Sequence, residues 1–243
     1  MAGNRERYKV FLQKLNEKMT LGNKLDFASS EAYKLLCANI MFAMPEEKAC
    51  RVIGVTSSRD GEGKSTTALN LAYMLAEDSQ RVLLIESDMR RPSLAKRLDM
   101  RMSPGLSNLL TGQIEPDRAI QRTWLQDNLF FIGAGDILPN PSKLLGSRSM
   151  RLLLDAVAGS FDDVILDLPP VTGVSDALVA SKVTDGMIVV VRQDYASRRA
   201  LAEAMRRLEF AEAKILGFVL TRSDVRSGGK KYKGCRCAAP RGR

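Results

Sequence analysis

Residues 57–66 read Ser57-Ser58-Arg59-Asp60-Gly61-Glu62-Gly63-Lys64-Ser65-Thr66. A short apolar run, 52–55, precedes this stretch, and a helical pattern over 65–77 follows it. A chain of phosphates is bound by main-chain N–H groups, a close approach of the backbone and a positive charge, which a helix N-terminus, glycines and a lysine supply. The order of strand, glycine-rich turn, Lys-Ser and helix therefore predicts a loop that cradles the phosphates of a nucleoside triphosphate.

The same loop supplies the predicted contacts to ATP and Mg²⁺. We expect Lys64 to reach the β- and γ-phosphates and Ser65 to give its hydroxyl to the metal. One position departs from the consensus G-x-x-x-x-G-K-[ST], because Ser58 stands where the consensus has glycine. The predicted nucleotide-binding residues are Ser58, Asp60, Gly61, Glu62, Gly63, Lys64, Ser65 and Thr66.

Carboxylates follow two later apolar runs. Leu83-Leu84-Ile85 leads into Glu86 and Asp88, and Val164-Ile165-Leu166 leads into Asp167 and two prolines. Ligands of parallel α/β folds bind at the carboxyl ends of the strands, and such acids can hold Mg²⁺ there. The sequence thus predicts a metal site made by Ser65, Asp88 and Asp167. Taken without the phosphate loop, the Glu86–Asp88 pair would indicate only a polar strand end with a turn.

The fold prediction rests on alternation between two periods. Strands buried on both faces are continuously apolar, and strands separated by helices form right-handed crossovers. We predict an α/β fold with a mostly parallel β-sheet flanked by helices on both faces, as in P-loop nucleoside triphosphatases. The expected strands are 52–55, 81–85, 129–132, 164–166, 187–191 and 215–220, and the expected helices after the first are 65–77, 106–110, 142–158, 176–181 and 197–210.

Three parts are expected along the chain. Residues 1–28 form an amphipathic appendage, 29–223 the phosphate-loop domain and 224–243 a flexible basic tail. Apolar side chains at helical spacing in 1–28 indicate a helix packed on the domain or on another copy, or one that contacts an anionic membrane. A second helix is expected to begin at a Ser29 or Ser30 cap, with Glu31 in its first turn.

Composition excludes several classes of protein. The 243 residues contain no histidine, which rules out Ser-His-Asp and Cys-His chemistry, and none of the four cysteines forms a C-x-x-C pair that would suggest zinc. The 37 Lys and Arg exceed the 28 Asp and Glu, for a net charge of +9, and eight of the basic residues lie from Arg222 onward. No apolar run is long enough to span a membrane, so a cytoplasmic or peripherally bound protein is expected.

The three motifs, in this order, resemble those of the bacterial tyrosine kinases of the CpsD/CapB exopolysaccharide type, a SIMIBI-like branch of the P-loop proteins related to MinD and ParA. The resemblance covers roughly residues 29–223. Beyond the phosphate loop it rests on four segments: Glu31-Ala32-Tyr33-Lys34-Leu35-Leu36, Asp88-Met89-Arg90-Arg91-Pro92, Leu138-Pro139-Asn140-Pro141-Ser142-Lys143-Leu144-Leu145, and Asp167-Leu168-Pro169-Pro170 followed by Ser175-Asp176-Ala177.

The resemblance implies phosphoryl transfer from ATP to tyrosine hydroxyls and control of capsule or exopolysaccharide synthesis. It implies catalytic roles for Lys64, Glu86, Asp88, Arg90 and Asp167. Glu86 matches an acid that activates the tyrosine, and Arg90 assists the phosphates or a neighbouring subunit. Glu86 stands where the family usually has Asp.

The resemblance also implies partners. These are the cytoplasmic tail of a membrane polysaccharide co-polymerase, which would bring the protein to the inner face of the cell membrane, a cognate phosphotyrosine phosphatase, and further copies of the chain, in a ring in some members. Lys34 and Cys37 occupy places where the family often has two arginines that help form that ring. The family ends in a cluster of tyrosines that are phosphorylated between subunits, and here only Tyr232 remains. The tail is either a phospho-acceptor or a solvated basic arm.

Two other functions are compatible with the motifs. One is an ATPase switch of the MinD/ParA type. Those proteins usually carry a signature lysine early in the loop, and Arg59 at that position argues against this function. The other is a regulatory subunit that binds ATP but phosphorylates weakly. No nucleic-acid partner is expected.

Overall fold

The computed structural model describes residues 22, 25–44 and 48–222. Within these residues one sheet has the strand order β3-β4-β2-β5-β1-β6-β7. Its neighbours pair in parallel except for β3 and β4, which pair antiparallel. The predicted α/β architecture with a mostly parallel sheet is therefore confirmed. The strands are β1 (Arg51–Ser57), β2 (Val82–Glu86), β3 (Gln121–Arg122), β4 (Leu129–Ile132), β5 (Asp163–Asp167), β6 (Gly186–Arg192) and β7 (Ile215–Thr221).

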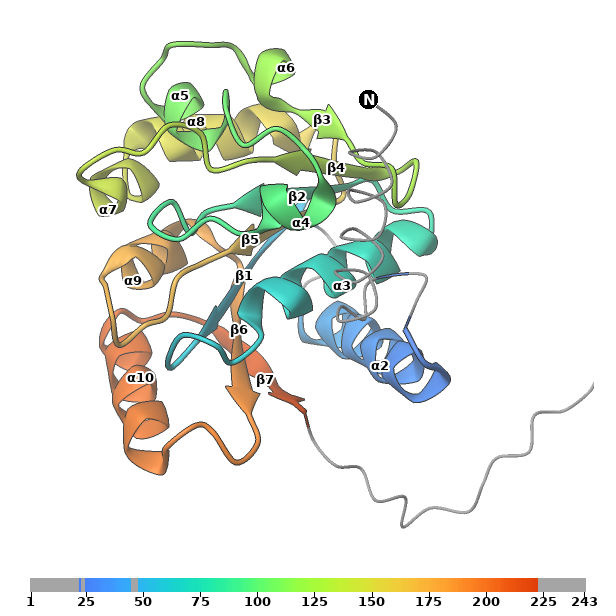
Figure 1. Ribbon diagram of the computed structural model, residues 1–243, viewed down its shortest axis with the longest axis vertical. Helices are drawn as coiled ribbons and strands as arrows, with labels where there is room; N and C mark the ends of the chain where they lie inside the picture. The colour runs from blue at the N-terminus through green and yellow to red at the C-terminus, as the bar shows by residue number, and fades with distance from the viewer. Residues whose placement is uncertain (1–21, 23–24, 45–47, 223–243) are drawn as a thin grey trace, which may run out of the picture.

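Helices cover both faces of this sheet (Figure 1). One face carries α2 (Phe27–Ala43), α3 (Lys64–Glu77) and α4 (Leu94–Leu98), whose apolar residues join one core with the sheet. The other face carries α5 (Leu106–Leu110), α6 (Pro116–Ala119), α7 (Pro141–Leu145), α8 (Arg148–Ala158), α9 (Asp176–Ala180) and α10 (Arg198–Phe210), which join a second core. A short 3-10 helix, Ser181–Val183, follows α9.

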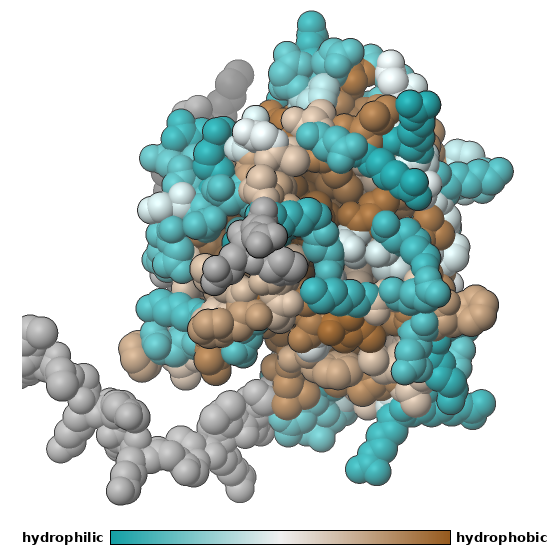
Figure 2. All heavy atoms as spheres, turned by 180° about the vertical axis from the view of Figure 1, so that it is seen from behind, coloured by the Kyte–Doolittle hydropathy of each residue, from teal (hydrophilic) through white to brown (hydrophobic). Residues whose placement is uncertain are grey.

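The continuous apolar runs of the central strands reflect burial on both faces. Along β2, Val82 and Leu84 belong to the core beneath α3, whereas Leu83 and Ile85 belong to the core on the opposite face. Side chains alternate along a strand, so a strand covered on both sides must be apolar at every position. Figure 2, seen from behind, shows that hydrophilic residues surround the hydrophobic areas on that face of the molecule.

Several predicted element boundaries were wrong. The first helix does not start at Ser29 or Ser30: it begins at Phe27, and the Asp26 side chain caps it by accepting from Ser29 N at 2.8 Å. The long helix expected over 142–158 is two helices, because Gly146 ends α7 and the Ser147 side chain caps α8 by accepting from Met150 N.

Four short elements in the described part of the chain were not predicted: α4, α6, β3 and the 3-10 helix Ser181–Val183. They contain only two to five residues each, which is too short for a periodic pattern to register.

The parallel strands β1, β2 and β5 end side by side, and this shared edge carries the phosphate loop and the predicted acids. The register pairs Val55 of β1 and Glu86 of β2 with Asp167 at the end of β5. Segments that are far apart in the sequence thus meet at one place, the usual position for a ligand in such folds. None of the helices in the described part of the chain is long and apolar enough to span a membrane.

Candidate functional site: a phosphate loop faced by buried acids

The loop between β1 and α3 has the backbone that a phosphate cradle needs. Gly61 and Gly63 have φ values of 79° and 97°, in a region that residues with a Cβ rarely adopt. Gly63 is the N-cap of α3, and no side chain caps this helix. The first N–H groups of a helix have no acceptor within it, so those of α3 are available to an anion at the end where the helix dipole favours negative charge.

Three other segments of the fold hold the loop in place. Thr221 at the end of β7 donates its hydroxyl to Glu62 O at 2.7 Å, and Thr172 after β5 donates to Ser58 O at 2.5 Å. Arg192 donates to Gly61 O at 3.3 Å, and its guanidinium lies 4.7 Å from the ring centre of Tyr195. The cradle is therefore fixed by the fold before any ligand is bound.

Ser58, the departure from the consensus, is paired with Glu62. The Glu62 carboxylate accepts from Ser58 N at 2.8 Å, from Ser58 Oγ at 2.9 Å and from Arg59 N at 3.2 Å, and both side chains are buried. A serine hydroxyl buried at a glycine position needs an acceptor, and Glu62 provides it. These two predicted nucleotide-binding residues thus use their side chains to shape the first part of the loop, where the Glu62 carboxylate occupies the main-chain N–H groups of Ser58 and Arg59.

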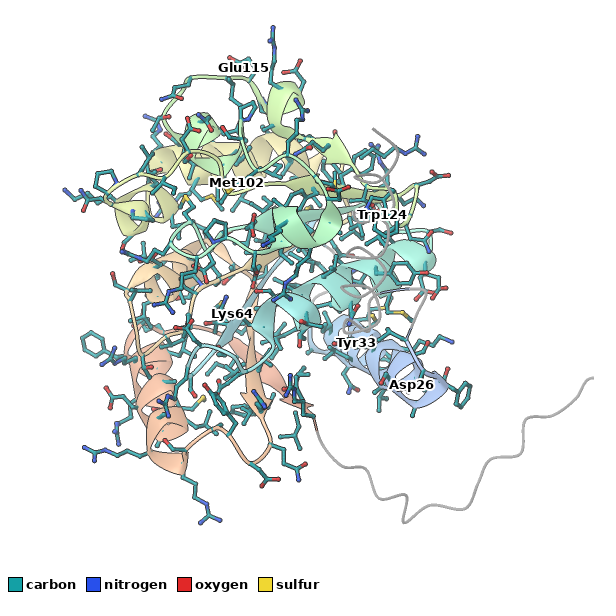
Figure 3. All side chains as sticks on the ribbon, viewed as in Figure 1. Asp26, Tyr33, Lys64, Met102, Glu115 and Trp124 are labelled. Carbon is teal, nitrogen blue, oxygen red and sulfur yellow. The ribbon has the colours of Figure 1, made fainter. Side chains whose placement is uncertain are left out.

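Lys64 lies between two acids from neighbouring strands, at the turn where α3 begins (Figure 3). Its ammonium is 2.7 Å from Asp88 Oδ2 and 3.9 Å from Asp167 Oδ1. Burial disfavours the charged ammonium, but the attraction of Asp167 and Asp88 outweighs it and raises the pKa of Lys64 above its ordinary value. The lysine is thus charged and held at the mouth of the loop.

The Asp167 carboxylate is suited to bind a cation. Its side chain is 1% exposed, and among the described residues Oδ1 is a buried oxygen without a hydrogen-bond donor. Burial raises the pKa of this carboxyl, opposed by the charge of Lys64 and a hydrogen bond from Ser65. Buried polar atoms are rarely left unpaired, and such exceptions often mark ligand sites.

The donor set matches magnesium in particular. In the described part of the chain no cluster of three or more metal-ligating side chains occurs. Mg²⁺ with a nucleotide is typically held by only one or two carboxylates, together with phosphate oxygens and water. Asp88, Asp167 and the Ser65 hydroxyl are thus the residues that could hold Mg²⁺ together with a triphosphate.

Glu86 is placed differently from the other acids. It is fully buried, and its carboxylate accepts from the backbone N–H groups of Ser93 and Leu94, and from Ala95 N at 3.4 Å. Burial raises the pKa of Glu86, and the amides of Leu94 and Ser93 oppose that shift. Glu86 thus anchors the first turn of α4.

Helix α4 in turn reaches the phosphate loop. Its Arg97 donates to Thr66 Oγ1 at 3.0 Å. Arg97 is a site residue that the sequence analysis missed, because a five-residue helix leaves no periodic signal.

Arg90 and Asp60 make ion pairs outside the cradle. Arg90 binds the buried Asp176 through two nitrogens, and Asp60 pairs with Arg91 at 2.7 Å on the exposed surface. Asp176 was predicted to belong to a motif, but no role was assigned to it. Nothing in the sequence indicates that it contacts Arg90, which lies 86 positions earlier. Tyr232, the predicted phospho-acceptor, lies outside the described residues.

Comparison with known proteins agrees with this geometry. The AAA domain family (AAA_31) matches residues 50–216. The tyrosine-protein kinase YwqD of Bacillus subtilis is 33% identical over 192 residues, which is 79% of this chain and 80% of that protein. The chimerical protein CapA2B2 superposes with a TM-score of 0.74 at 34% identity, covering 78% of this chain and 83% of that one.

A more distant structure shows a nucleotide in the same fold. The septum site-determining protein MinD of Pyrococcus horikoshii, complexed with Mg-ADP, is 25% identical with a TM-score of 0.60, and the match covers 72% of each chain. P-loop relatives of this chain thus bind adenine nucleotides with Mg²⁺.

The sheet, the glycine loop and the facing acids define a P-loop nucleoside triphosphatase. Within that class, the chain belongs to the bacterial tyrosine kinase family of the CpsD, CapB and YwqD type. The predicted family and the predicted class of enzyme, a protein-tyrosine kinase, are confirmed.

Proposed function

We propose that this protein transfers the γ-phosphoryl group of Mg·ATP to tyrosine hydroxyls, including its own, and thereby regulates capsule or exopolysaccharide synthesis. The observation that carries the proposal is the Lys64 ammonium held between Asp88 and Asp167 at the N-terminus of α3. Phosphoryl transfer depends mainly on positioning and on neutralising charge, and this arrangement supplies both.

Each residue of the site has a part in that reaction. The amides of residues 61–66 and Lys64 hold the phosphates, while Ser65, Asp88 and Asp167 hold the metal. Bound Mg²⁺ would supply charge neutralisation at the β- and γ-phosphate oxygens. The tyrosine oxygen bonds to the γ-phosphorus, and the bond from that phosphorus to the β–γ bridging oxygen breaks with its electron pair on the oxygen of ADP. The ADP leaves and the phenolic proton passes to water.

The family resemblance implies that Glu86 activates the tyrosine hydroxyl, but its contacts favour another role. Activation of a tyrosine requires a carboxylate within hydrogen-bond reach of the phenol. The oxygens of Glu86 are bound to amides of α4, and that helix places Arg97 on Thr66. These contacts favour a role for Glu86 in holding α4 against the phosphate loop.

The tail is the proposed acceptor. The described chain ends at Arg222, one residue after Thr221, whose hydroxyl bonds to the phosphate loop. Tyr232 follows ten residues later, a length that spans at most about 35 Å when extended. An acceptor on such a segment can visit a site on its own subunit or on a neighbouring one.

Changing Tyr232 to Phe should remove most of the autophosphorylation, because the hydroxyl that receives the phosphoryl group is lost while the ATP site is untouched. The measurement is mass-spectrometric mapping of phosphotyrosine after incubation with Mg·ATP, together with turnover on an added tyrosine peptide. Peptide turnover should stay within about twofold, because the substitution leaves every residue of the proposed ATP site in place. Undiminished phosphotyrosine in Tyr232→Phe would exclude the tail as the main acceptor. ATP hydrolysis without phosphotyrosine anywhere would favour an ATPase switch.

The proposed partner is the cytoplasmic tail of a membrane protein of the polysaccharide co-polymerase type. Support comes from the family and from the similarity to the chimerical protein CapA2B2, whose name points to a CapA-type partner. A synthetic peptide of that tail should tighten Mg·ATP binding and raise the phosphorylation rate. An unchanged dissociation constant and rate at saturating peptide would refute the partnership.

A further inference from the structure

Three motifs outside the phosphate cradle meet at Asp176, the first residue of α9. Its side chain is 0% exposed. Its two oxygens accept from Arg90 Nε at 2.9 Å and Arg90 Nη2 at 3.1 Å, and Oδ1 also accepts from Ser142 Oγ at 2.6 Å. Arg90 Nη2 lies 3.3 Å from the same Ser142 hydroxyl. The loop after β2, the start of α7 and the start of α9 are thus joined by one charged cluster.

This cluster is connected to the reacting groups through a short stretch of main chain. Arg90 is two residues after Asp88, the acid whose Oδ2 lies 2.7 Å from Lys64 Nζ. The other oxygen of Asp88 accepts from Arg91 N at 3.1 Å, which closes a tight turn around Arg90. Any movement of Arg90 away from Asp176 would therefore pull on the turn that orients the Asp88 carboxylate.

The chemistry of the cluster is suited to fixing a position. A planar guanidinium that binds both oxygens of a carboxylate sets direction as well as distance, which a lysine ammonium cannot do. Asp176 has no exposure to water, so removing its cation would leave a buried charge without compensation. The pair therefore holds the turn strongly in one geometry.

We propose that Arg90, Asp176 and Ser142 form a latch that fixes Asp88 relative to Lys64 and the metal. Arg90 and Asp176 are then positioning residues that act through Asp88. The inference rests on the proposed function, because it assigns these residues to phosphoryl transfer. It differs from the family-based expectation in that Arg90 does not need to touch a phosphate or a neighbouring subunit.

The test compares Arg90→Lys, Asp176→Asn and the double variant. Two readouts are used: kcat and KM on a tyrosine peptide, and the Mg²⁺ concentration that half-saturates ADP binding, measured with a fluorescent ADP analogue. We expect each single variant to lower kcat at least about tenfold with little change in peptide KM, and to raise the Mg²⁺ requirement. The double variant should be no worse than either single one, because one interaction is lost in all three.

Several results would overturn the latch. If Arg90 contacts phosphate directly, Arg90→Lys should weaken nucleotide binding while Asp176→Asn leaves it intact. An unchanged Mg²⁺ requirement in Asp176→Asn would also refute it. The binding readout needs no kinase activity, so the latch can be judged even if no phosphotyrosine is formed and the proposed function fails.

Three further variants separate the proposed latch from simple unfolding. Ser142→Ala removes one hydrogen bond to Asp176 and keeps both charges, so it should shift the same two readouts in the same direction by about threefold with the fold retained. Arg122→Lys and Asp127→Asn make the same two changes in an exposed ion pair, in which Arg122 of β3 lies 2.9 Å from Asp127. They should leave both readouts unchanged. A null result for Ser142→Ala in the folded protein would contradict the cluster's role.

Discussion

Lys64→Met is expected to abolish tyrosine phosphorylation, with a fall in rate of at least about a hundredfold, because a preorganised charge aimed at the transferring phosphoryl group is removed. Methionine has nearly the same length and apolar stem but leaves the phosphate charge and the two acids uncompensated. The assay is an anti-phosphotyrosine blot with quantified turnover on a tyrosine peptide, alongside circular dichroism to confirm the fold.

The matched control for this change is Lys96→Met. Lys96 is an exposed lysine of α4, so its replacement removes the same charge without touching the cradle. It should phosphorylate at close to the unaltered rate. If Lys64→Met kept more than about a tenth of the activity, the lysine would not be stabilising the transferred group and the proposed mechanism would be wrong.

The second large effect is expected for Asp167→Asn, which keeps the shape of the side chain and removes its charge. Phosphorylation should fall at least about a hundredfold, since one of the two carboxylates proposed to hold the metal beside Lys64 is lost. Binding of ADP should lose most of its dependence on Mg²⁺. Isothermal calorimetry with and without Mg²⁺ measures this directly.

Thermal unfolding tests the same variant independently, through the direction in which its stability changes. Burial raises the pKa of Asp167, so its charged form is disfavoured in the folded protein, and Asn relieves that cost. Without nucleotide, Asp167→Asn should therefore be as stable as the unaltered protein or more so. The rise in Tm produced by Mg·ADP should shrink, because the ligand binds the folded state less tightly. An undiminished rise would show that Asp167 does not serve the metal.

Two comparison variants sharpen this experiment. Asp155→Asn changes an exposed acid of α8 and should be neutral in every measurement. Glu86→Gln keeps an oxygen for the amides of α4, so Mg²⁺-dependent ADP binding should survive. If its phosphorylation rate nevertheless fell a hundredfold, the role that the family resemblance gives to Glu86, activation of the tyrosine, would be favoured over the holding of α4.

The fold and the core of the site could be predicted from local patterns. The glycines, Lys64 and Ser65 follow one another along the chain, so their joint purpose is visible in ten residues. The acids Asp88 and Asp167 stand at the ends of apolar runs, and parallel topology brings strand ends together. The mostly parallel sheet follows from strands without polar positions, since burial on both faces demands it.

Contacts between distant segments could not be predicted in this way. Whether a carboxylate binds metal, caps a helix or pairs with arginine depends on which groups the packed chain brings within about 3 Å of it. Thus Glu86 and Asp88, two residues apart, face different partners: one faces the amides of α4 and the other faces Lys64. Likewise, Ser142 and Arg90 are separated by 52 positions and meet only because the start of α7 and the loop after β2 lie beside the start of α9.

The order of residues alone therefore established the phosphate loop, the class of fold and the family, because each of these is written in short, contiguous or periodic stretches. Tertiary structure alone assigned partners to the charged side chains: Glu62 to Ser58, Glu86 to α4, and Arg90 to Asp176. The physical reason is that a motif is a local property of the chain, whereas the partner of a buried charge is set by whatever the fold places next to it.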